Sequence, residues 1–198
     1  MSKKYIPQQM ISRSRFRNMY KEWNEEDRTL LVNKMDVLIR ENSQYTDSKN
    51  YGFLCNLLTS LAIVQVLEGK GMLRKDAQKY AADAMYKFIE PQIESMKKLA
   101  SHGWFVRFLK LTMPLKFKKT LGYGWDVEFP KCGKNEFSMI THKCIFRQIF
   151  EKYGMPEMTA IFCKVDDILY SNLPRADFLY TQQIGTGGTK CDYTFRGK

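Results

Sequence analysis

Apolar residues recur at helical spacing through the first 120 positions of the chain. Asn24 can cap the start of a helix whose first turn is acidic. The apolar stripe of this helix consists of Leu30, Leu31, Met35, Leu38 and Ile39. A second helix is expected over about 51–68. Its apolar run at 53–67 contains polar residues and is too short to span a membrane, so it predicts a buried central helix.

Two further helices are expected, and each contains a proline. The third begins near Arg74 and should be kinked or ended by Pro91, because proline removes an interior backbone N–H bond. The fourth covers 104–118 and is limited by Pro114. Residues 1–22 are polar, basic and weakly patterned, and predict a partly ordered arm.

After residue 120 the period of the apolar positions changes from helical to alternating. Strands are expected over 122–130 and 136–141, followed by helices at 144–154 and 156–171 and then by a C-terminal hairpin. The order predicts an α+β fold, in which N-terminal helices pack with a C-terminal antiparallel sheet of about four strands with a helical insertion. We expect a single domain over 1–198: a basic arm (1–22), a mainly helical part (23–120) and an α+β part (121–198).

The C-terminal hairpin is predicted from two alternating arms around a glycine-rich turn. The upstream arm places on one face Phe178, Tyr180, Gln182 and Ile184, and the downstream arm does the same with Cys191, Tyr193 and Phe195. Glycine at 185, 187 and 188 permits the turn, and the N–H groups of Gly187 and Gly188 could form an anion-binding nest. Core packing is the alternative for Cys191. Asp192, on the opposite face, is either an acid/base group or a surface partner of Arg196.

The composition narrows the classes of partner. The 198 residues are 44% hydrophobic and carry a net charge of +11, and no acidic residue lies between Lys97 and Lys119. Such a chain attracts anions, and a small-molecule carboxylate is the favoured partner. Residues 97–119 are typical either of a helix that contacts a membrane or nucleic acid, which is the less favoured reading, or of a core helix with snorkelling lysines. The pattern does not predict an oligomeric state.

The five cysteines predict reduced thiols in a cytoplasmic protein. Their number is odd, no CxxC pair occurs, and the N-terminus has no apolar signal-peptide segment. Neither a metal site nor a cofactor is expected, because no close pair of metal ligands and no nucleotide-binding fingerprint is present.

Two sites place a thiol where it could take part in chemistry. In the helix at 156–171, Cys163 and Asp167 fall opposite the core stripe, with Asp166 at its flank, so this face is either a pocket wall or a solvated acidic pair. At the strand-to-helix junction 141–144, Thr141 could cap the helix and Cys144 would lie in its first turn. The helix dipole and Lys143 would then lower the pKa of Cys144, unless this cysteine is a core filler.

An ordered series of short motifs resembles the L-2-amino-thiazoline-4-carboxylic acid hydrolase family over about residues 125–196. The series is Thr141-x-x-Cys144, Gly154-x-Pro156-Glu157, Phe162-Cys163-x-x-Asp166-Asp167, Pro174, Thr181-Gln-x-Ile184, Gly188 and Cys191-Asp192-Tyr193-x-Phe195. In the closing motif Tyr193 stands where the family more often has phenylalanine.

The resemblance implies hydrolytic opening of a small cyclic amidine that carries a carboxylate, giving N-carbamoyl-L-cysteine or a related product. It implies an acid/base carboxylate from Asp166, Asp167 or Asp192, a thiol from Cys144, Cys163 or Cys191, and a substrate-binding group among Thr141, Lys143, Gly187 and Gly188. The alternatives are a non-catalytic module that binds a small ligand and a basic protein that binds anionic membrane or nucleic acid.

Overall fold

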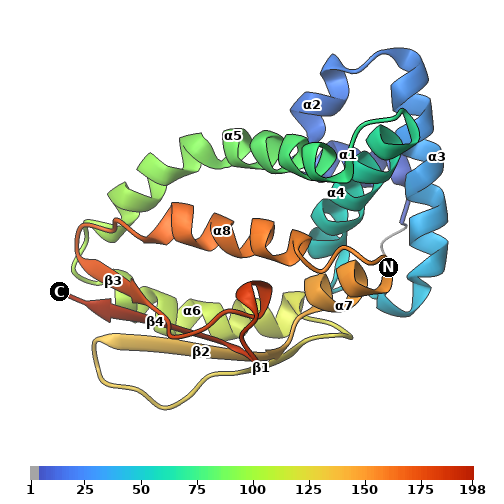
Figure 1. The fold of residues 1–198 in the computed structure, drawn as a ribbon. Coiled ribbons are helices and arrows are strands. Elements are labelled where there is room, and N and C mark those ends of the chain that lie inside the picture. Colours follow the sequence, from blue (N-terminus) through green and yellow to red (C-terminus); the bar gives the residue numbers. More distant parts are fainter. Residues whose placement is uncertain (1–4) are drawn as a thin grey trace. The chain divides into compact units, whose positions relative to one another are not determined.

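The computed structural model describes residues 5–198, which form two compact units (Figure 1). The first unit ends at Phe88 and the second runs from Ile89 to Lys198. The division falls inside helix α5 (Arg74–Ala100), close to Pro91. That the whole chain acts as a single domain stays a prediction.

The first unit is helical. It contains α1 (Pro7–Arg13), α2 (Arg17–Glu22), α3 (Glu25–Glu41), the short 3-10 helix η1 (Ser43–Tyr45), α4 (Tyr51–Gly69) and the start of α5. Asn24 caps α3 as predicted, because its side-chain oxygen accepts a hydrogen bond of 2.9 Å from the backbone N–H of Asp27. Helix α4 packs against α1 and α3, which confirms its central place.

The prediction of a partly ordered arm over residues 1–22 is wrong for residues 5–22, which are the part of this segment that the structure describes. Residues 7–22 form α1 and α2, and Met10, Ile11 and Phe16 are buried against the rest of the first unit. The prediction failed because these apolar residues lie on two very short helices, so no repeating stripe appears in the sequence.

Within residues 5–198, α4 is one helix whose length and composition would suffice to cross a membrane. In its most apolar window, 61% is buried inside the protein. The hydrophobic side chains therefore face protein, as expected for a core helix.

The second unit carries the sheet. After α5 come α6 (Phe105–Thr120), β1 (Asp126–Glu128), β2 (Glu136–Lys143), α7 (Ile145–Lys152), α8 (Met158–Tyr170), β3 (Ala176–Leu179), the 3-10 helix η2 (Ile184–Thr186) and β4 (Cys191–Gly197). The four strands are antiparallel in the order β1-β2-β4-β3. The α+β fold, with two helices inserted before the last two strands, is thus confirmed.

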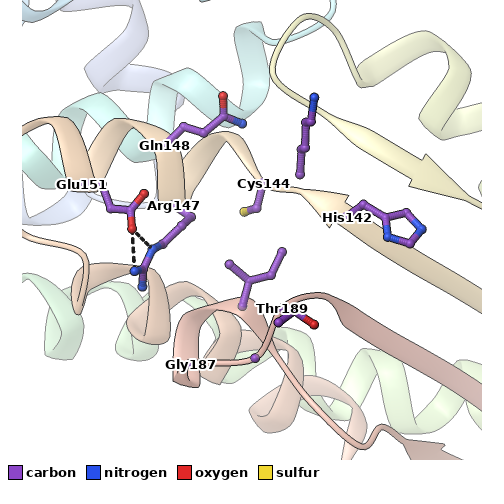
Figure 2. Close-up of a pocket in the computed structure, with 10 residues that line it drawn as sticks. His142, Cys144, Arg147, Gln148, Glu151, Gly187 and Thr189 are labelled. Atoms are coloured by element: carbon purple, nitrogen blue, oxygen red, sulfur yellow. Dashed lines mark hydrogen bonds and ion pairs between the residues drawn. The ribbon is translucent and has the colours of Figure 1, made fainter.

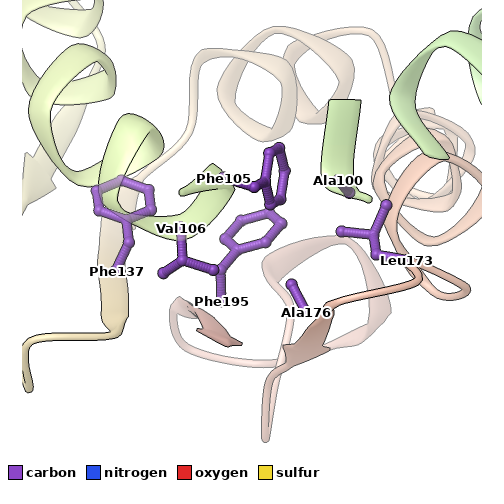
Figure 3. Close-up of a cluster of buried hydrophobic side chains, with 7 residues drawn as sticks. All are labelled: Ala100, Phe105, Val106, Phe137, Leu173, Ala176 and Phe195. Carbon is purple, nitrogen blue, oxygen red and sulfur yellow. The ribbon is translucent and has the colours of Figure 1, made fainter. Parts of the chain in front are cut away.

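One face of this sheet is covered by aromatic packing. Phe137 on β2 lies opposite Phe195 on β4, with ring centroids 6.2 Å apart, and both join a buried cluster with Phe105 and Val106 of α6 (Figure 3). Tyr170 of α8 adds an edge contact to Phe195 at 5.2 Å. Because side chains alternate along a strand, Cys191 and Tyr193 lie on this same covered face.

Two predictions about helix ends and one about the hairpin are corrected. Helix α5 continues past Pro91 to Ala100, so Pro91 does not end it, and α6 continues past Pro114 to Thr120. Neighbouring strong helix formers outweigh one lost N–H bond. Strands β3 and β4 do pair, but residues 180–190 form a long loop that contains η2 instead of a tight turn. Gly187 in this loop has a φ of +96°, a left-handed conformation that favours glycine and was the reason for expecting glycine in the turn.

Candidate functional site

Helix α8 turns its predicted polar face toward the sheet. Cys163 on this face is buried, so the solvated alternative is wrong for it. Tyr170, at the end of the same face, packs on Phe178 with ring centroids 5.4 Å apart. Strands β3 and β4 lie next to this face, and helical periodicity alone could not show that α8 is covered on both sides. Cys163 therefore belongs to a wall inside the second unit.

Cys191 accepts several hydrogen bonds at its sulfur. The Cys163 thiol, the backbone N–H of Ile184 (N to Sγ, 3.3 Å) and the Tyr193 hydroxyl all donate to it. The bond from Cys163 contributes most and outweighs burial, so the pKa of the Cys191 thiol falls to about 7. The same bond, helped by burial, raises the pKa of Cys163, because that thiol must keep its proton to donate. Of the two thiols, Cys163 therefore keeps its proton and Cys191 is the one that ionises more readily.

Gly185 allows η2 to lie directly on α8. A Cβ atom at this position would stand 2.6 Å from the Cys163 sulfur and 2.9 Å from the backbone nitrogen of Ala160. The Gly185 N–H also donates to the Cys163 sulfur. Position 185 thus needs glycine because a side chain there would prevent the close approach of the backbone to the Cys163 thiol. The glycine of this loop that has a positive φ is Gly187.

Cys144 joins the cluster from the start of α7. It packs against Ile184, Cys191 and Tyr193, and it occupies the N-cap position of the helix. Burial raises the pKa of its thiol to about 11, although the N–H groups of Phe146 and Arg147 oppose the rise. The lowered pKa predicted from the helix dipole is therefore wrong, because desolvation outweighs the dipole.

Asp166 completes the group from the flank of α8. Its charge contributes to the raised pKa of Cys144, and after burial it is the largest cause of the raised pKa of Tyr193. The carboxylate therefore lies within electrostatic reach of both. The structure thus brings together four of the sequence candidates, Cys144, Cys163, Cys191 and Asp166.

A hollow of about 450 Å³ opens beside this cluster, between α7 and the loop that follows η2 (Figure 2). Its lining consists of His142, Lys143, Cys144, Arg147, Gln148, Glu151, Ile184, Gly187, Gly188 and Thr189. The volume lies within the usual range for small-molecule sites. Cys191 stands behind Cys144 and Ile184, which separate it from the open space.

Sequence reasoning missed three residues on one face of α7. Arg147, Gln148 and Glu151 follow Cys144 at the helical spacings i+3, i+4 and i+7, and that spacing was the available signal. Arg147 pairs with Glu151 at 2.5 Å, and Gln148 donates a hydrogen bond of 2.6 Å to the carbonyl of Gly124. The Glu151 carboxylate balances the charge of Arg147, so Lys143 supplies the positive charge at the edge of the hollow.

The predicted anion nest is occupied by the loop itself. The N–H of Gly188 donates to the Gln183 carbonyl at 2.8 Å, and that of Gly187 to the Ile184 carbonyl at 3.4 Å. Both glycines line the hollow, but their N–H groups fold the loop instead of facing a ligand. Lys143, an exposed side chain at the rim, is the predicted anion-binding residue that has its charge available there.

The remaining candidates lie outside the thiol cluster. Thr141 is buried within β2 opposite Cys191 and does not cap α7, because the strand runs on to Lys143. Asp167 accepts a hydrogen bond of 2.9 Å from the Tyr180 hydroxyl. Among residues 5–198, no three His, Cys, Asp or Glu side chains are grouped to hold a metal ion.

Asp192 holds the start of the loop. Its carboxylate accepts hydrogen bonds from the backbone N–H groups of Thr181 (2.8 Å) and Gln182 (3.0 Å) and from the Thr181 hydroxyl. Partial burial acts to raise its pKa, but these bonds together hold the pKa below its usual value. Arg196 pairs with Glu136 at 2.7 Å, so the predicted surface pair between Asp192 and Arg196 is wrong, whereas an acid/base role for Asp192 stays a prediction.

We expect Asp192→Asn to lower the free energy of unfolding by about 1 kcal/mol at neutral pH, a value reduced for solvent screening. Because the pKa of Asp192 is lower in the folded protein, the carboxylate stabilises the fold at pH values above the pKa of an aspartate in the unfolded chain, about 3.9. This contribution is lost as the pH falls through the folded-state pKa. Urea unfolding should therefore show the difference at neutral pH, and the difference should shrink as the pH falls through the folded-state pKa of Asp192. Asp126→Asn, on the exposed edge of β1, is the matched control, and an equal loss there would contradict the assignment.

The fold and the site define an α+β protein with a thiol cluster beside a cationic hollow. The family model described as L-2-amino-thiazoline-4-carboxylic acid hydrolase matches residues 55–195, so the chain belongs to this family. The match extends the motif series, which began near residue 125, into the helices of the first unit. No curated protein matches the chain.

Two solved structures align along most of the chain. Both are crystal structures of the Fe(II) unliganded H-NOX protein from K. algicida, one of them an alanine-to-glycine mutant. Each is 13% identical over 96% of this chain and 95% of the other, with TM-scores of 0.33 for the mutant and 0.32 for the unmutated protein. Similarity at this level carries no argument about fold or ligand.

Proposed function

We propose that the protein opens a small cyclic amidine that carries a carboxylate, L-2-amino-thiazoline-4-carboxylate or a close relative, by hydrolysis at the carbon between sulfur and nitrogen. The observation that carries the proposal is the buried Cys191 sulfur beside the hollow, where hydrogen bonds from Cys163, Ile184 and Tyr193 favour its thiolate form. Membership of the hydrolase family supports the same class of reaction.

Cys191 is the better nucleophile of the two candidate thiols. At pH 7 a thiol of pKa about 7 is half ionised, whereas one of pKa about 11 is ionised roughly 10⁻⁴ of the time. The more basic thiolate reacts faster by roughly 40–100-fold for that difference in pKa. The difference in ionisation is larger than this loss, so Cys191 keeps the advantage over Cys144 at neutral pH.

In the first step the Cys191 sulfur adds to the amidine carbon of the substrate, which enters as the protonated amidinium and pairs its charge with the Asp166 carboxylate. The ring C–S bond then breaks, its electron pair leaves on sulfur, and the substrate remains attached to Cys191 as an isothiourea. Water adds to the same carbon, gives a proton to the Asp166 carboxylate, and the bond to Cys191 breaks. The sum is one water consumed and one thiol released, with no oxidant or reductant.

The surroundings fit the remaining needs of this reaction. Lys143 at the rim of the hollow would attract the substrate carboxylate. Ile184 must move aside to admit the substrate to Cys191, and it lies on η2, at the edge of a long loop. Purified protein incubated with the thiazoline acid should release thiol at a rate that rises with pH through about 7. Folded protein that releases no thiol above background would contradict this substrate.

We expect Tyr193→Phe to move the pH dependence without abolishing activity. Loss of the hydroxyl donor raises the pKa of Cys191, so the pH–rate midpoint should shift upward and the rate at pH 7 should fall roughly tenfold. The rate at high pH should recover. Tyr180→Phe, which removes a hydroxyl bound to Asp167 instead, should leave the midpoint in place. A uniform loss at every pH would mean that Tyr193 only packs.

A further inference from the structure

Helix α6 presents a second apolar face that the rest of the second unit, residues 89–198, leaves exposed. One side of the helix is buried in the sheet cluster through Phe105 and Val106, as Figure 3 shows. The other side carries large hydrophobic residues that stay accessible: Trp104 (48% exposed), Phe108 (42%), Leu111 (72%) and Leu115 (65%).

These residues form one continuous stripe along the helix. Their spacing of four, three and four residues keeps them on a single face, opposite the buried one. Trp104 and Phe108 make an edge contact, with ring centroids 5.6 Å apart. The stripe is about 16 Å long at 1.5 Å per residue.

Positive charge flanks the stripe on both sides. Arg107 and Lys118 fall along one edge at 100° per residue, and Lys119 along the other. No acidic residue occurs from Lys97 to Lys119. Lys110, nearer the buried side, instead donates to the carbonyls of Cys132 (3.0 Å) and Gly133 (2.9 Å).

We propose that this face of α6 binds the surface of an anionic lipid bilayer, with the helix lying in the plane of the interface. The leucines enter the boundary of the acyl chains, Trp104 lies at the headgroup level that indole favours, and the flanking cations meet lipid phosphates. Because the buried face fixes α6 to the sheet, the helix needs no folding on binding. The proposal is independent of the hydrolase reaction.

Charge and side-chain type favour lipid over other occupants. A second copy of the chain would bring like charges together along the edges of an apolar seam. Nucleic acid would pair with the cations but would leave Leu111 and Leu115 against water or phosphate. An anionic bilayer satisfies both the apolar stripe and its charged edges.

The test is flotation of the full chain with vesicles of phosphatidylcholine alone or mixed with phosphatidylserine. Binding is expected for the mixed vesicles, and it should weaken as salt is raised. Leu111→Glu combined with Leu115→Glu should lower the affinity by at least about a hundredfold. Lys118→Glu combined with Lys119→Glu should lower it by roughly tenfold or more.

Matched controls separate the stripe from general charge and stickiness. Leu73→Glu replaces a leucine that is 74% exposed in the first unit, and Lys87→Glu replaces an exposed lysine there; both should bind as the parent does. No binding to anionic vesicles at low salt, or equal losses in the controls, would overturn the proposal. The proposal would also be overturned if double-stranded DNA displaced the vesicles and bound the leucine variants as tightly as the parent. A third contradicting result is that the protein forms concentration-dependent dimers, which the leucine variants lose, and does not bind lipid.

Discussion

Cys191→Ser should lower the rate of thiazoline ring opening roughly 10³-fold or more, while the protein stays folded. A serine hydroxyl is not ionised at neutral pH, so the variant loses the nucleophile and keeps only binding and acid/base assistance. The buried sulfur lies among Cys163, Ile184 and Tyr193, and a serine fits that space with little change in volume. Thiol release and thermal unfolding measured on the same preparation give both quantities.

Two cysteine controls make this prediction specific. Cys132→Ser alters a thiol that bonds the Glu136 carbonyl at 3.0 Å, away from the cluster, and should leave the rate unchanged. Cys144→Ser should cost less than Cys191→Ser, because Cys144 touches the hollow but holds its proton. Full activity in Cys191→Ser, with activity lost in Cys144→Ser, would assign the nucleophile to Cys144 and remove Cys191 from that role.

Gly185→Ala should destabilise the protein by about 1–3 kcal/mol and lower activity by roughly a hundredfold or more. The added methyl group would meet the Cys163 sulfur at 2.6 Å and the Ala160 backbone at 2.9 Å, and the helix backbone cannot yield easily. The η2 segment must therefore move off α8, which takes the Ile184 donor away from Cys191.

The matched substitution is Gly52→Ala, since a Cβ at Gly52 has no atom within 4 Å. Gly52 lies in α4, where alanine favours the helix, so stability should be unchanged or slightly higher. Urea unfolding and the pH–rate midpoint measured for both variants separate crowding at the site from a general effect of alanine. A Gly185→Ala protein with unaltered stability and pH profile would mean that the loop tolerates displacement.

The sequence was informative wherever one local pattern dominated. Asn24 before acidic residues marked the start of α3, and the change of period after residue 120 marked the sheet. The same reasoning failed at the loop before β4, where Ile184 continued an alternating pattern but lies in a 3-10 helix. There Asp192 and Gly185 decide the backbone, through contacts that local periodicity does not encode.

The site followed from sequence only in part. The resemblance left three thiols and three aspartates as candidates, and the structure gathers the three thiols with Asp166 and has Cys163 donate to Cys191. The direction of the pKa shift at Cys144 could not be predicted, because it depends on how much water Ile184 and Tyr193 exclude. Periodicity likewise could not separate the covered face of α8 from a solvated one.

The central claim, that Cys191 is the thiolate, is tested most directly by an ultraviolet titration of thiolate absorbance in the parent protein and in Cys191→Ser. The difference between the two should show one thiolate that forms with a midpoint near pH 7, well below an ordinary cysteine. A difference curve that is flat until about pH 9, or a low-pH thiolate that persists in Cys191→Ser, would contradict it.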